Sequence, residues 1–278
     1  MVLKSFAKVN LFLSVNKKLK NKLHDLQSVY CLIDLFDKIT LKKNNFKSDQ
    51  VYFRGPYSKY VKKTNNSVLK VLKIMRENKL ISNYYSIKIF KEIPVFAGLG
   101  GGTSNAATVL KHLCKKKVGK KIFNKIVDYV GSDLRLFFSD QGYLKNLNKV
   151  YELKKKFTLY FLLVDPKILV STKEVYSKVK KYSNKKKIPI EKLKHKKVFI
   201  DHLAKFDNDL QLIVEKKYPI ISRLLADISK ERGCFFSRMS GSGSACYGLF
   251  SDRNCSKVAL RLLKKKYPKF NFSIAKTI

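Results

Sequence analysis

The sequence is poor in acidic residues and cysteines and has no long apolar stretch, and each shortage excludes a class of protein. Among its 278 residues it carries 20 Asp+Glu against 60 Lys+Arg, a formal net charge of +40. The longest apolar runs, such as residues 157–164, fall far short of the ~20 residues that a membrane-spanning helix needs. We therefore expect no transmembrane helix. Residues 1–15 also lack the apolar core of a secretory signal, so secretion is not indicated.

The cysteines are odd in number and scattered along the chain, at Cys31, Cys114, Cys234, Cys246 and Cys255. No Cys-x-x-Cys pair occurs among them, which argues against a disulfide framework and against a zinc site. We expect free thiols, as is typical of a reducing cytoplasm.

What the chain does contain is 45% hydrophobic residues, enough to exclude global disorder. A chain of this length buries roughly 70–75% of its unfolded surface, in one large or two medium domains. The expected elements follow a mixed order, without strict alternation of strands and helices. This order predicts an α+β fold with two lobes that meet near residue 155.

Hydrophobic periodicity places the individual elements. Alternating or continuous apolar runs predict strands over residues 3–15, 26–35, 84–90, 157–164, 235–239, 245–250 and 270–275. Helical spacing, with polar residues at the starts, predicts helices over residues 65–78, 105–113, 120–130, 199–212, 219–231 and 258–266. The lysine-rich stretch 179–197 is predicted to be a nearly structureless surface segment.

The positive charge first suggests a protein that binds polyanions such as nucleic acids. However, 52 of the basic residues are lysine and 8 are arginine, and arginine is preferred for bidentate contacts with phosphates and bases. The lysines are spread along the whole chain, and no nucleic-acid-binding motif accompanies them. We favour surface composition as the explanation and keep a polyanion-binding protein as an alternative.

The strongest local pattern is the glycine-rich segment 94–104, which lies between a strand ended by proline and a helix. Its four glycines let backbone N–H groups approach an anion, and the helix start that follows favours phosphate. The segment is not a Walker loop, because no Lys-Ser/Thr pair follows the last glycine. It is not the dinucleotide fingerprint either, because Thr103 stands where a third glycine is required. We predict a phosphate-binding loop, with a flexible surface turn as the alternative.

A second loop of small residues, Ser240–Ser244, follows Arg238-Met239 and precedes an apolar strand. Alone, it is equally typical of an ordinary hairpin connection. Together with the first loop, it is better interpreted as a second wall of one phosphate site.

Phosphoryl transfer also needs a base near the acceptor hydroxyl, and the chain offers few carboxylates for this role. Asp133 follows a glycine and precedes a very apolar segment, so it is either a cap or a base facing a cleft. Lys8 lies inside the apolar first strand and either faces solvent or shares a functional face with Asn10, two residues on. His24 is either an incidental loop histidine or a ligand contact.

Assembled in order, these segments resemble the GHMP kinase superfamily over nearly the whole chain. The matching segments are Ser5–Leu13, His24–Val29, Ile33–Asp37, Ile93–Ala107, Gly131–Asp133, Val164–Pro166, Ser171–Tyr176, Phe206–Leu210 and Arg238–Ser244. The glycine loop is a mark of the whole superfamily. The resemblance to the member that acts on a cytidine-linked alcohol lies in Ser5–Leu13, in His24–Val29 with Ile33–Asp37, and in the Ser-Thr-x-x-x-Tyr segment at 171–176.

The resemblance implies a two-lobed kinase, with an N-terminal ATP-binding lobe over residues 1–154, a C-terminal lobe over 155–278 and the cleft between them. It implies transfer of the ATP γ-phosphate, with Mg²⁺, to the 2-hydroxyl of a cytidine diphosphate-linked methylerythritol, in non-mevalonate isoprenoid synthesis. It implies no tightly bound cofactor, no required nucleic acid or membrane, and a cytoplasmic monomer or weak homodimer, with the metal ligands unassigned. A homoserine- or mevalonate-type kinase of the same superfamily is the alternative.

The resemblance also implies roles for single residues. Asp133 would accept the hydroxyl proton, while Lys8 would orient the hydroxyl and lower the pKa of the carboxylate by its opposite charge. ATP would be held by Pro94, Val95, Phe96, Ala97, Gly98, Leu99, Gly100, Gly101, Gly102, Thr103 and Ser104. The substrate would be contacted by Asn10 and Thr172, by His24 at the cytosine edge, and by Tyr176, which would stack on the base.

Three positions depart from the superfamily pattern. The residue before His24 is usually aromatic, but here it is Leu23, so the stack on the cytosine would be one-sided. Arg135 and the glycine-poor stretch 141–150 replace a proline and a glycine-rich turn. Thr103 replaces a serine and keeps its hydroxyl.

Overall fold

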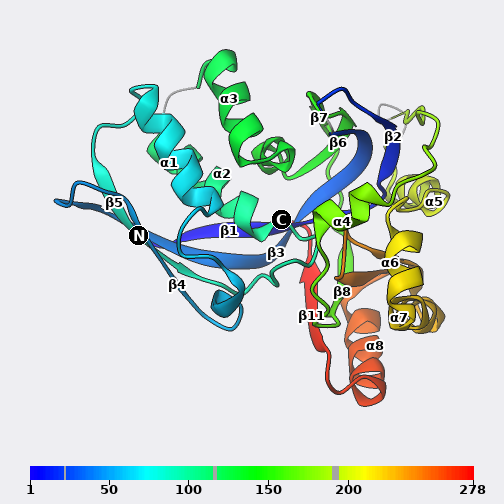
Figure 1. The fold of residues 1–278 in the computed structure, drawn as a ribbon. Helices are drawn as coiled ribbons and strands as arrows, with labels where there is room; N and C mark the ends of the chain where they lie inside the picture. Colours follow the sequence, from blue (N-terminus) through cyan, green and yellow to red (C-terminus); the bar gives the residue numbers. More distant parts are fainter. Residues whose placement is uncertain (22, 115–117, 190–193) are drawn as a thin grey trace. The chain divides into compact units, whose positions relative to one another are not determined.

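The computed structural model describes residues 1–21, 23–114, 118–189 and 194–278 (Figure 1). The chain divides into two compact units, each built from separate stretches of sequence. Unit 1 contains Met1–Lys8, Leu35–Val95 and Gly100–Phe138, and unit 2 contains Val9–Asp34, Phe96–Leu99 and Ser139–Ile278. This division differs from the expected lobes 1–154 and 155–278, because the strands β1 (Leu3–Asn10) and β3 (His24–Asn44) each contribute to both units.

Unit 1 is a sheet with helices on one face (Figure 1). In the sheet, β5 (Tyr84–Phe90) pairs parallel with β4 (Gln50–Arg54) and antiparallel with the second half of β3. Helix α1 (Ser67–Glu77) packs on α2 (Gly101–Leu113) and α3 (Lys120–Val130). Two 3₁₀ helices complete the unit, η1 (Ser58–Tyr60) and η2 (Ser132–Phe138).

Unit 2 contains two sets of strands. In the first, the first half of β3 pairs antiparallel with β2 (Ser14–Lys18) and with β6 (Gln141–Asn146), and β7 (Lys149–Glu152) pairs with β6. The second is an antiparallel sheet of order β11-β8-β10-β9, in which the strands are β8 (Tyr160–Asp165), β9 (Cys234–Met239), β10 (Cys246–Phe250) and β11 (Asn271–Lys276).

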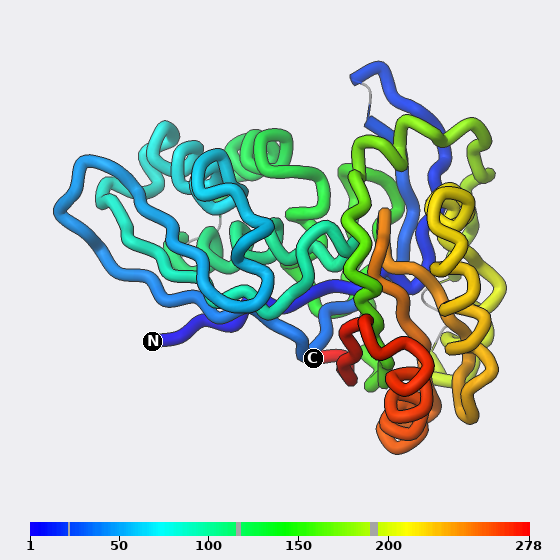
Figure 2. Tube along the Cα trace, turned by 60° about the horizontal axis from the view of Figure 1, so that its bottom comes forward, coloured from blue at the N-terminus to red at the C-terminus, as the bar shows by residue number. Residues whose placement is uncertain are grey.

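Helices cover this second sheet, and the chain can be followed through them by colour in Figure 2. Helix α7 (Pro219–Lys230) packs on β9 and β10, and α8 (Arg253–Lys266) packs on β8 and β11. The shorter helices of the unit are α4 (Thr172–Ser177), α5 (Lys196–Ala204) and α6 (Gln211–Lys217). Among the described residues, no helix is both long and apolar enough to cross a membrane.

The local patterns predict several elements correctly. The strand over 84–90 and the helix over 120–130 have the expected bounds, and α1 lies within the expected range 65–78. The cap of α1 is also confirmed, because the Asn66 side chain accepts hydrogen bonds from the backbone N–H groups of Val68 and Leu69. Residues 179–189 form no helix or strand, as expected, and residues 190–193 of that stretch lie outside the described residues. The end of the stretch was predicted wrongly, because α5 begins at Lys196.

Other expected bounds are wrong. The strand expected over 3–15 is two strands, β1 and β2, and the helix expected over 199–212 is two helices, α5 and α6. Helix α2 begins at Gly101 rather than at 105, and α8 begins at Arg253 rather than at 258, because Asp252 caps it by accepting from Cys255 N. The elements β4, β6, β7 and α4 were not expected, since they are short and their burial depends on distant partners.

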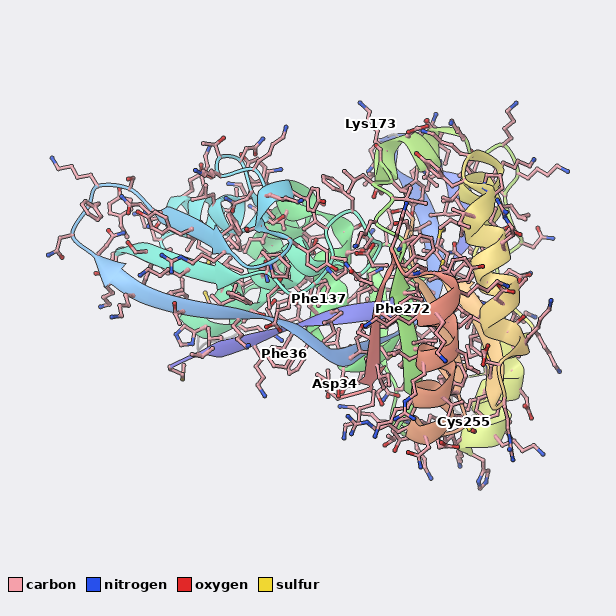
Figure 3. All side chains as sticks on the ribbon, turned by 90° about the horizontal axis from the view of Figure 1, so that it is seen from below. Asp34, Phe36, Phe137, Lys173, Cys255 and Phe272 are labelled. Atoms are coloured by element: carbon pink, nitrogen blue, oxygen red, sulfur yellow. The ribbon has the colours of Figure 1, made fainter. Side chains whose placement is uncertain are left out.

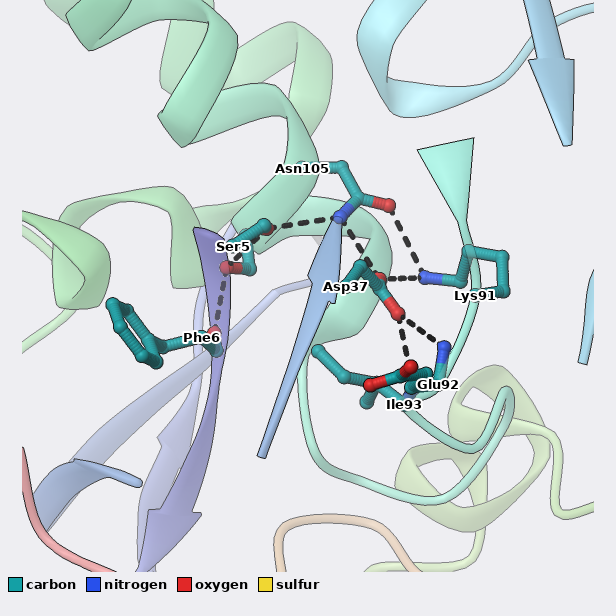
Figure 4. A network of polar contacts seen from close by, with 8 residues as sticks. Ser5, Phe6, Asp37, Lys91, Glu92, Ile93 and Asn105 are labelled. Atoms are coloured by element: carbon teal, nitrogen blue, oxygen red, sulfur yellow. Dashed lines mark hydrogen bonds and ion pairs between the residues drawn. The ribbon is translucent and has the colours of Figure 1, made fainter. Parts of the chain in front are cut away.

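The core of unit 1 contains a buried ion pair between Lys91, which follows β5, and Asp37 in β3 (Figure 4). The second oxygen of Asp37 accepts the backbone N–H groups of Glu92 and Ile93, at 2.8 and 2.9 Å. Asn105 in α2 donates to Asp37 at 2.9 Å and accepts from Lys91 at 3.1 Å. The network ties the first turns of α2 to β3 and to the chain that leaves β5.

Replacing Lys91 with methionine should lower the free energy of unfolding by about 3–5 kcal/mol, because it leaves the buried carboxylate of Asp37 without its cation. The double variant Lys91→Met/Asp37→Asn should lose less than the single variant, since the neutral amide still accepts one N–H group. Urea unfolding of purified variants measures both effects. Lys38→Met is the matched control, because Lys38 forms an exposed pair with Glu92 at 3.0 Å and should cost less than about 1 kcal/mol.

Gly98 in unit 2 lies very close to the backbone of Ser240. Its φ is +72°, and a Cβ atom there would lie 2.0 Å from the carbonyl oxygen of Ser240. We therefore expect Gly98→Ala to lower the free energy of unfolding by about 3 kcal/mol, from overpacking and left-handed strain together. Gly119→Ala is the control, because no atom of the described residues, apart from Gly119 itself and its chain neighbours, lies within 4 Å of its ideal Cβ position. A Gly98→Ala variant as stable as Gly119→Ala would contradict this close contact.

Candidate functional site

Lys8 and Asp133 form an ion pair within unit 1. The Lys8 Nζ atom lies 3.6 Å from Oδ2 of Asp133, and the side chains are 4% and 41% exposed, respectively. The alternative that Lys8 merely faces solvent is therefore wrong. Burial lowers the pKa of the Lys8 ammonium, and the charge of Asp133 acts in the opposite direction. The pair combines a buried cation with a carboxylate that solvent can reach.

Gly100 brings the glycine segment up to this pair. It is the N-terminal cap of α2, with φ at +70°, and a Cβ atom there would lie 2.8 Å from the Phe137 ring and 3.2 Å from Lys8 Cγ. The first helical hydrogen bond of α2 runs from Ser104 N to the Gly100 carbonyl, at 2.8 Å. The backbone amides of residues 101–103 thus belong to the part of a helix start that has no intrahelical acceptor. These amides follow directly on Gly100, which lies next to the Lys8 side chain.

The side chain of Ser104 has partners inside unit 1. Its hydroxyl donates to the Phe6 carbonyl at 2.6 Å and accepts from the Ser5 hydroxyl at 2.8 Å. Asn105 donates to the same Ser5 oxygen at 2.9 Å, which joins this chain of contacts to the Lys91–Asp37 network (Figure 4). The serine expected to bind ATP therefore fixes α2 to β1, whereas Gly102 is exposed and Thr103 half-buried.

The residues of the glycine segment that belong to unit 2 pack on the second loop, Ser240–Ser244. Ser240 Oγ donates to the Gly98 carbonyl at 3.1 Å, and the Ala245 N–H donates to the Ala97 carbonyl at 3.2 Å. The two small-residue loops are therefore in contact, as their pairing in the sequence suggested. Their binding of phosphate stays a prediction.

Two of the expected substrate contacts lie beside these loops in unit 2. Asn10 is buried, its side-chain amide donates to Ser28 Oγ at 2.8 Å, and its carbonyl accepts from the Tyr247 hydroxyl at 3.0 Å. Thr172, the first residue of α4, shares a hydrogen bond of 2.8 Å with the Ser242 hydroxyl. Both residues are therefore held by protein contacts, and their substrate contacts stay predictions.

The other two expected contacts lie together in an aromatic cluster of unit 2, formed by His24, Tyr176 and Tyr182. The His24 ring stacks on Tyr176 with a centroid distance of 5.1 Å and on Tyr182 with a distance of 6.3 Å. Burial and the charge of Lys18 lower the pKa of His24, which favours the neutral form of its imidazole. A neutral imidazole offers one donor and one acceptor in the plane of its ring.

The patterns in the sequence missed three groups of residues that shape these parts. Arg238 is buried and donates to the carbonyls of Leu11 and Ala204, at 2.6 and 3.1 Å. Asn208 donates to the carbonyls of Met239 and Gly241, and so holds the Ser240–Ser244 loop. The third group is Lys91 with Asp37. Their burial and their hydrogen-bond partners are not visible in a single sequence, although Arg238, Asn208 and Asp37 lie in the matching segments.

Among the residues that the structure describes, no group of three or more His, Cys, Asp or Glu is placed to hold a metal ion. A Mg²⁺ ion that binds with a nucleotide needs only one or two protein ligands, because phosphates and water supply the others. The donors present, with Asp133 beside the start of α2, fit an ion of that kind.

Comparison with known proteins identifies the family. The profile of the GHMP kinases N terminal domain matches residues 66–131, and that of GHMP kinases C terminal matches residues 197–269. A 4-diphosphocytidyl-2-C-methyl-D-erythritol kinase of Pelagibacter ubique is 36% identical over 95% of this chain and 94% of its own length. The protein of the same name from Caldanaerobacter subterraneus is 32% identical, over 99% of this chain and 96% of its own.

Solved structures share the fold. The crystal structure of a 4-(cytidine 5'-diphospho)-2C-methyl-D-erythritol kinase superimposes with a TM-score of 0.74 at 22% identity, over 99% of each chain. A homoserine kinase from Cytophaga hutchinsonii gives a TM-score of 0.71 at 14% identity, over 100% of this chain and 94% of its own. These matches confirm the α+β GHMP kinase fold. Together with the sequence relatives, they show that the chain belongs to the 4-diphosphocytidyl-2-C-methyl-D-erythritol kinase family of the GHMP kinases.

Proposed function

We propose that this protein transfers the γ-phosphate of ATP to the 2-hydroxyl of 4-diphosphocytidyl-2-C-methyl-D-erythritol, a step of non-mevalonate isoprenoid precursor synthesis. Membership of the family supports the reaction and the substrate. The observation that carries the chemistry is the pair of buried Lys8 and accessible Asp133, beside the glycine at the start of α2. A homoserine kinase and a mevalonate kinase share the fold at 14% and 17% identity. Identities this low give no support to homoserine or mevalonate as the substrate.

In this proposal Asp133 accepts the proton of the attacking hydroxyl. Phosphoryl transfer leaves little covalent chemistry to the protein, so positioning and charge provide most of the acceleration. The carboxylate is 41% exposed, which leaves room for an alcohol to reach it. Lys8 is buried and its Nζ atom lies 3.6 Å from Oδ2 of Asp133, so its charge would act next to the oxygen atoms that react.

The phosphates of ATP are proposed to bind along Pro94–Ser104. The amides of residues 101–103 and the positive end of the α2 dipole favour an anion at this helix start. The exposed Gly102 and the half-buried Thr103 leave this backbone accessible. Mg²⁺ would enter with the nucleotide and neutralise the charge on its phosphates. The proposal leaves the protein ligands of this ion unassigned and needs no tightly bound cofactor.

The second substrate is proposed to be contacted by Asn10, His24, Thr172 and Tyr176. The neutral His24 ring can pair with the edge of cytosine, which presents both a donor and an acceptor. Tyr176, whose ring is stacked on His24, offers a face to the base. A polar edge contact and a ring face together would distinguish a cytidine-linked alcohol from a bare one.

The proposal places the enzyme in the cytoplasm, as a monomer or weak homodimer that requires neither nucleic acid nor a membrane. The five cysteines are free thiols in the structure, which fits a reducing compartment.

Asp133→Asn should lower kcat by about 10²- to 10⁴-fold, the usual contribution of a general base. Because Lys8 is buried, removing the charge of its partner should also lower the free energy of unfolding, and urea unfolding checks that the variant is folded under the assay conditions. ADP release measures turnover. Asp140→Asn is a matched control, because Asp140 also pairs with a lysine and is 41% exposed, and it should keep at least half of the activity. Turnover retained in Asp133→Asn would exclude Asp133 as the base.

The substrate is tested by ADP release with a panel of alcohols. We expect turnover with 4-diphosphocytidyl-2-C-methyl-D-erythritol, and a kcat/KM at least about 10-fold lower with the same alcohol lacking cytidine, because the base contacts are lost. Homoserine and mevalonate serve as controls. Preferred turnover of either one would replace the proposed substrate with that alcohol.

A further inference from the structure

The segment that follows α4 is held in place in unit 2 although it forms no helix or strand. The Ser183 N–H donates to the carbonyl of Val15 in β2 at 2.9 Å, and the Ser183 carbonyl accepts from the Asn16 side chain of the same strand at 3.0 Å. The backbone of Lys186 makes two hydrogen bonds with the side chain of Gln27 in β3. Its N–H donates to Gln27 Oε1 at 2.7 Å, and its carbonyl accepts from Gln27 Nε2 at 3.1 Å. Between them, Lys185 pairs with the buried Asp25 at 3.0 Å. These contacts position the segment beside His24, the residue before Asp25.

This attachment places the ring of Tyr182 in the aromatic cluster. The ring planes of Tyr182 and Tyr176 are inclined by 30° and 29° to that of His24. Tyr182 is 44% exposed, although the chain on its C-terminal side is firmly held. An exposed aromatic ring on an anchored segment loses little conformational freedom when it stacks on a planar ligand.

Leu23 supplies no such ring. This residue precedes His24 and is 49% exposed. A leucine cannot stack on a base as a planar ring does. The second aromatic face of the cluster therefore comes from a segment more than 150 residues away in the sequence, at Tyr182.

We propose that Tyr182 is a specificity-determining residue that stacks on the cytosine of the substrate. This inference rests on the proposed function, since it assumes that a cytidine-linked alcohol is the substrate. Tyr182 acts on binding and not on the transfer step, because the base is remote from the hydroxyl that reacts.

The test compares Tyr182→Leu, which removes the ring, with Tyr182→Phe, which keeps it. Tyr182→Leu should raise the KM for the cytidine-linked substrate about 10-fold, an effect typical of one lost base–aromatic stack, with kcat and the KM for ATP within twofold of wild type. For Tyr182→Phe, the KM for the cytidine-linked substrate, kcat and the KM for ATP should all stay within about twofold of the wild-type values. The KM for the same alcohol lacking cytidine should not change in either variant, whereas a general loss of structure would affect both alcohols. Direct titration with cytidine monophosphate should show the same loss of affinity.

Tyr52→Leu is the control, because Tyr52 is another exposed tyrosine and lies on β4 in unit 1. An unchanged KM in Tyr182→Leu, or an equal loss in Tyr182→Phe, would overturn the inference and leave the proposed function intact. Failure of the wild type to use the cytidine-linked alcohol would overturn both. If Tyr182→Leu does not fold, the comparison of Tyr182→Phe with Tyr182→His decides, since a smaller ring should bind the base more weakly.

Discussion

The buried ion pair of Lys91 and Asp37 is the constraint on which the arrangement of unit 1 depends. Neither charge can be left alone in the core, because an uncompensated buried ion is strongly destabilising. Each therefore requires the other, and Asn105 satisfies both from α2. Through Ser5 and Ser104 the same contacts reach β1, the strand that carries Lys8. The start of α2 is thereby held next to the Lys8–Asp133 pair before any substrate binds.

The glycine segment serves both units, and close packing fixes each half of it. In unit 1 a side chain at Gly100 would collide with Phe137 and Lys8, and in unit 2 a side chain at Gly98 would collide with the Ser240 carbonyl. Glycine is thus needed at these two positions for space as well as for backbone conformation. The phosphate-binding role proposed for the segment depends on a backbone that other parts of the chain already hold.

The charge of +40 has a limited part in this account. Among the described residues, two lysines are buried and paired with carboxylates, Lys8 with Asp133 and Lys91 with Asp37. Figure 3 shows many nitrogen-tipped side chains, such as that of Lys173, extending outward from the chain. Both proposed substrates are polyphosphates, so this positive potential would help to gather them without specifying either one.

The sequence by itself determined the parts that depend on neighbouring residues: the strand over 84–90, the helix over 120–130, the glycine segment and the family. It also named Lys8 and Asp133, but it left open whether Lys8 faces solvent. Only the tertiary structure decided that question, together with the pairing of Lys91 with Asp37, 54 residues apart, and the position of Tyr182 beside His24. These contacts join segments far apart in the chain, and no local periodicity encodes which of many lysines or tyrosines is buried or held against a given partner.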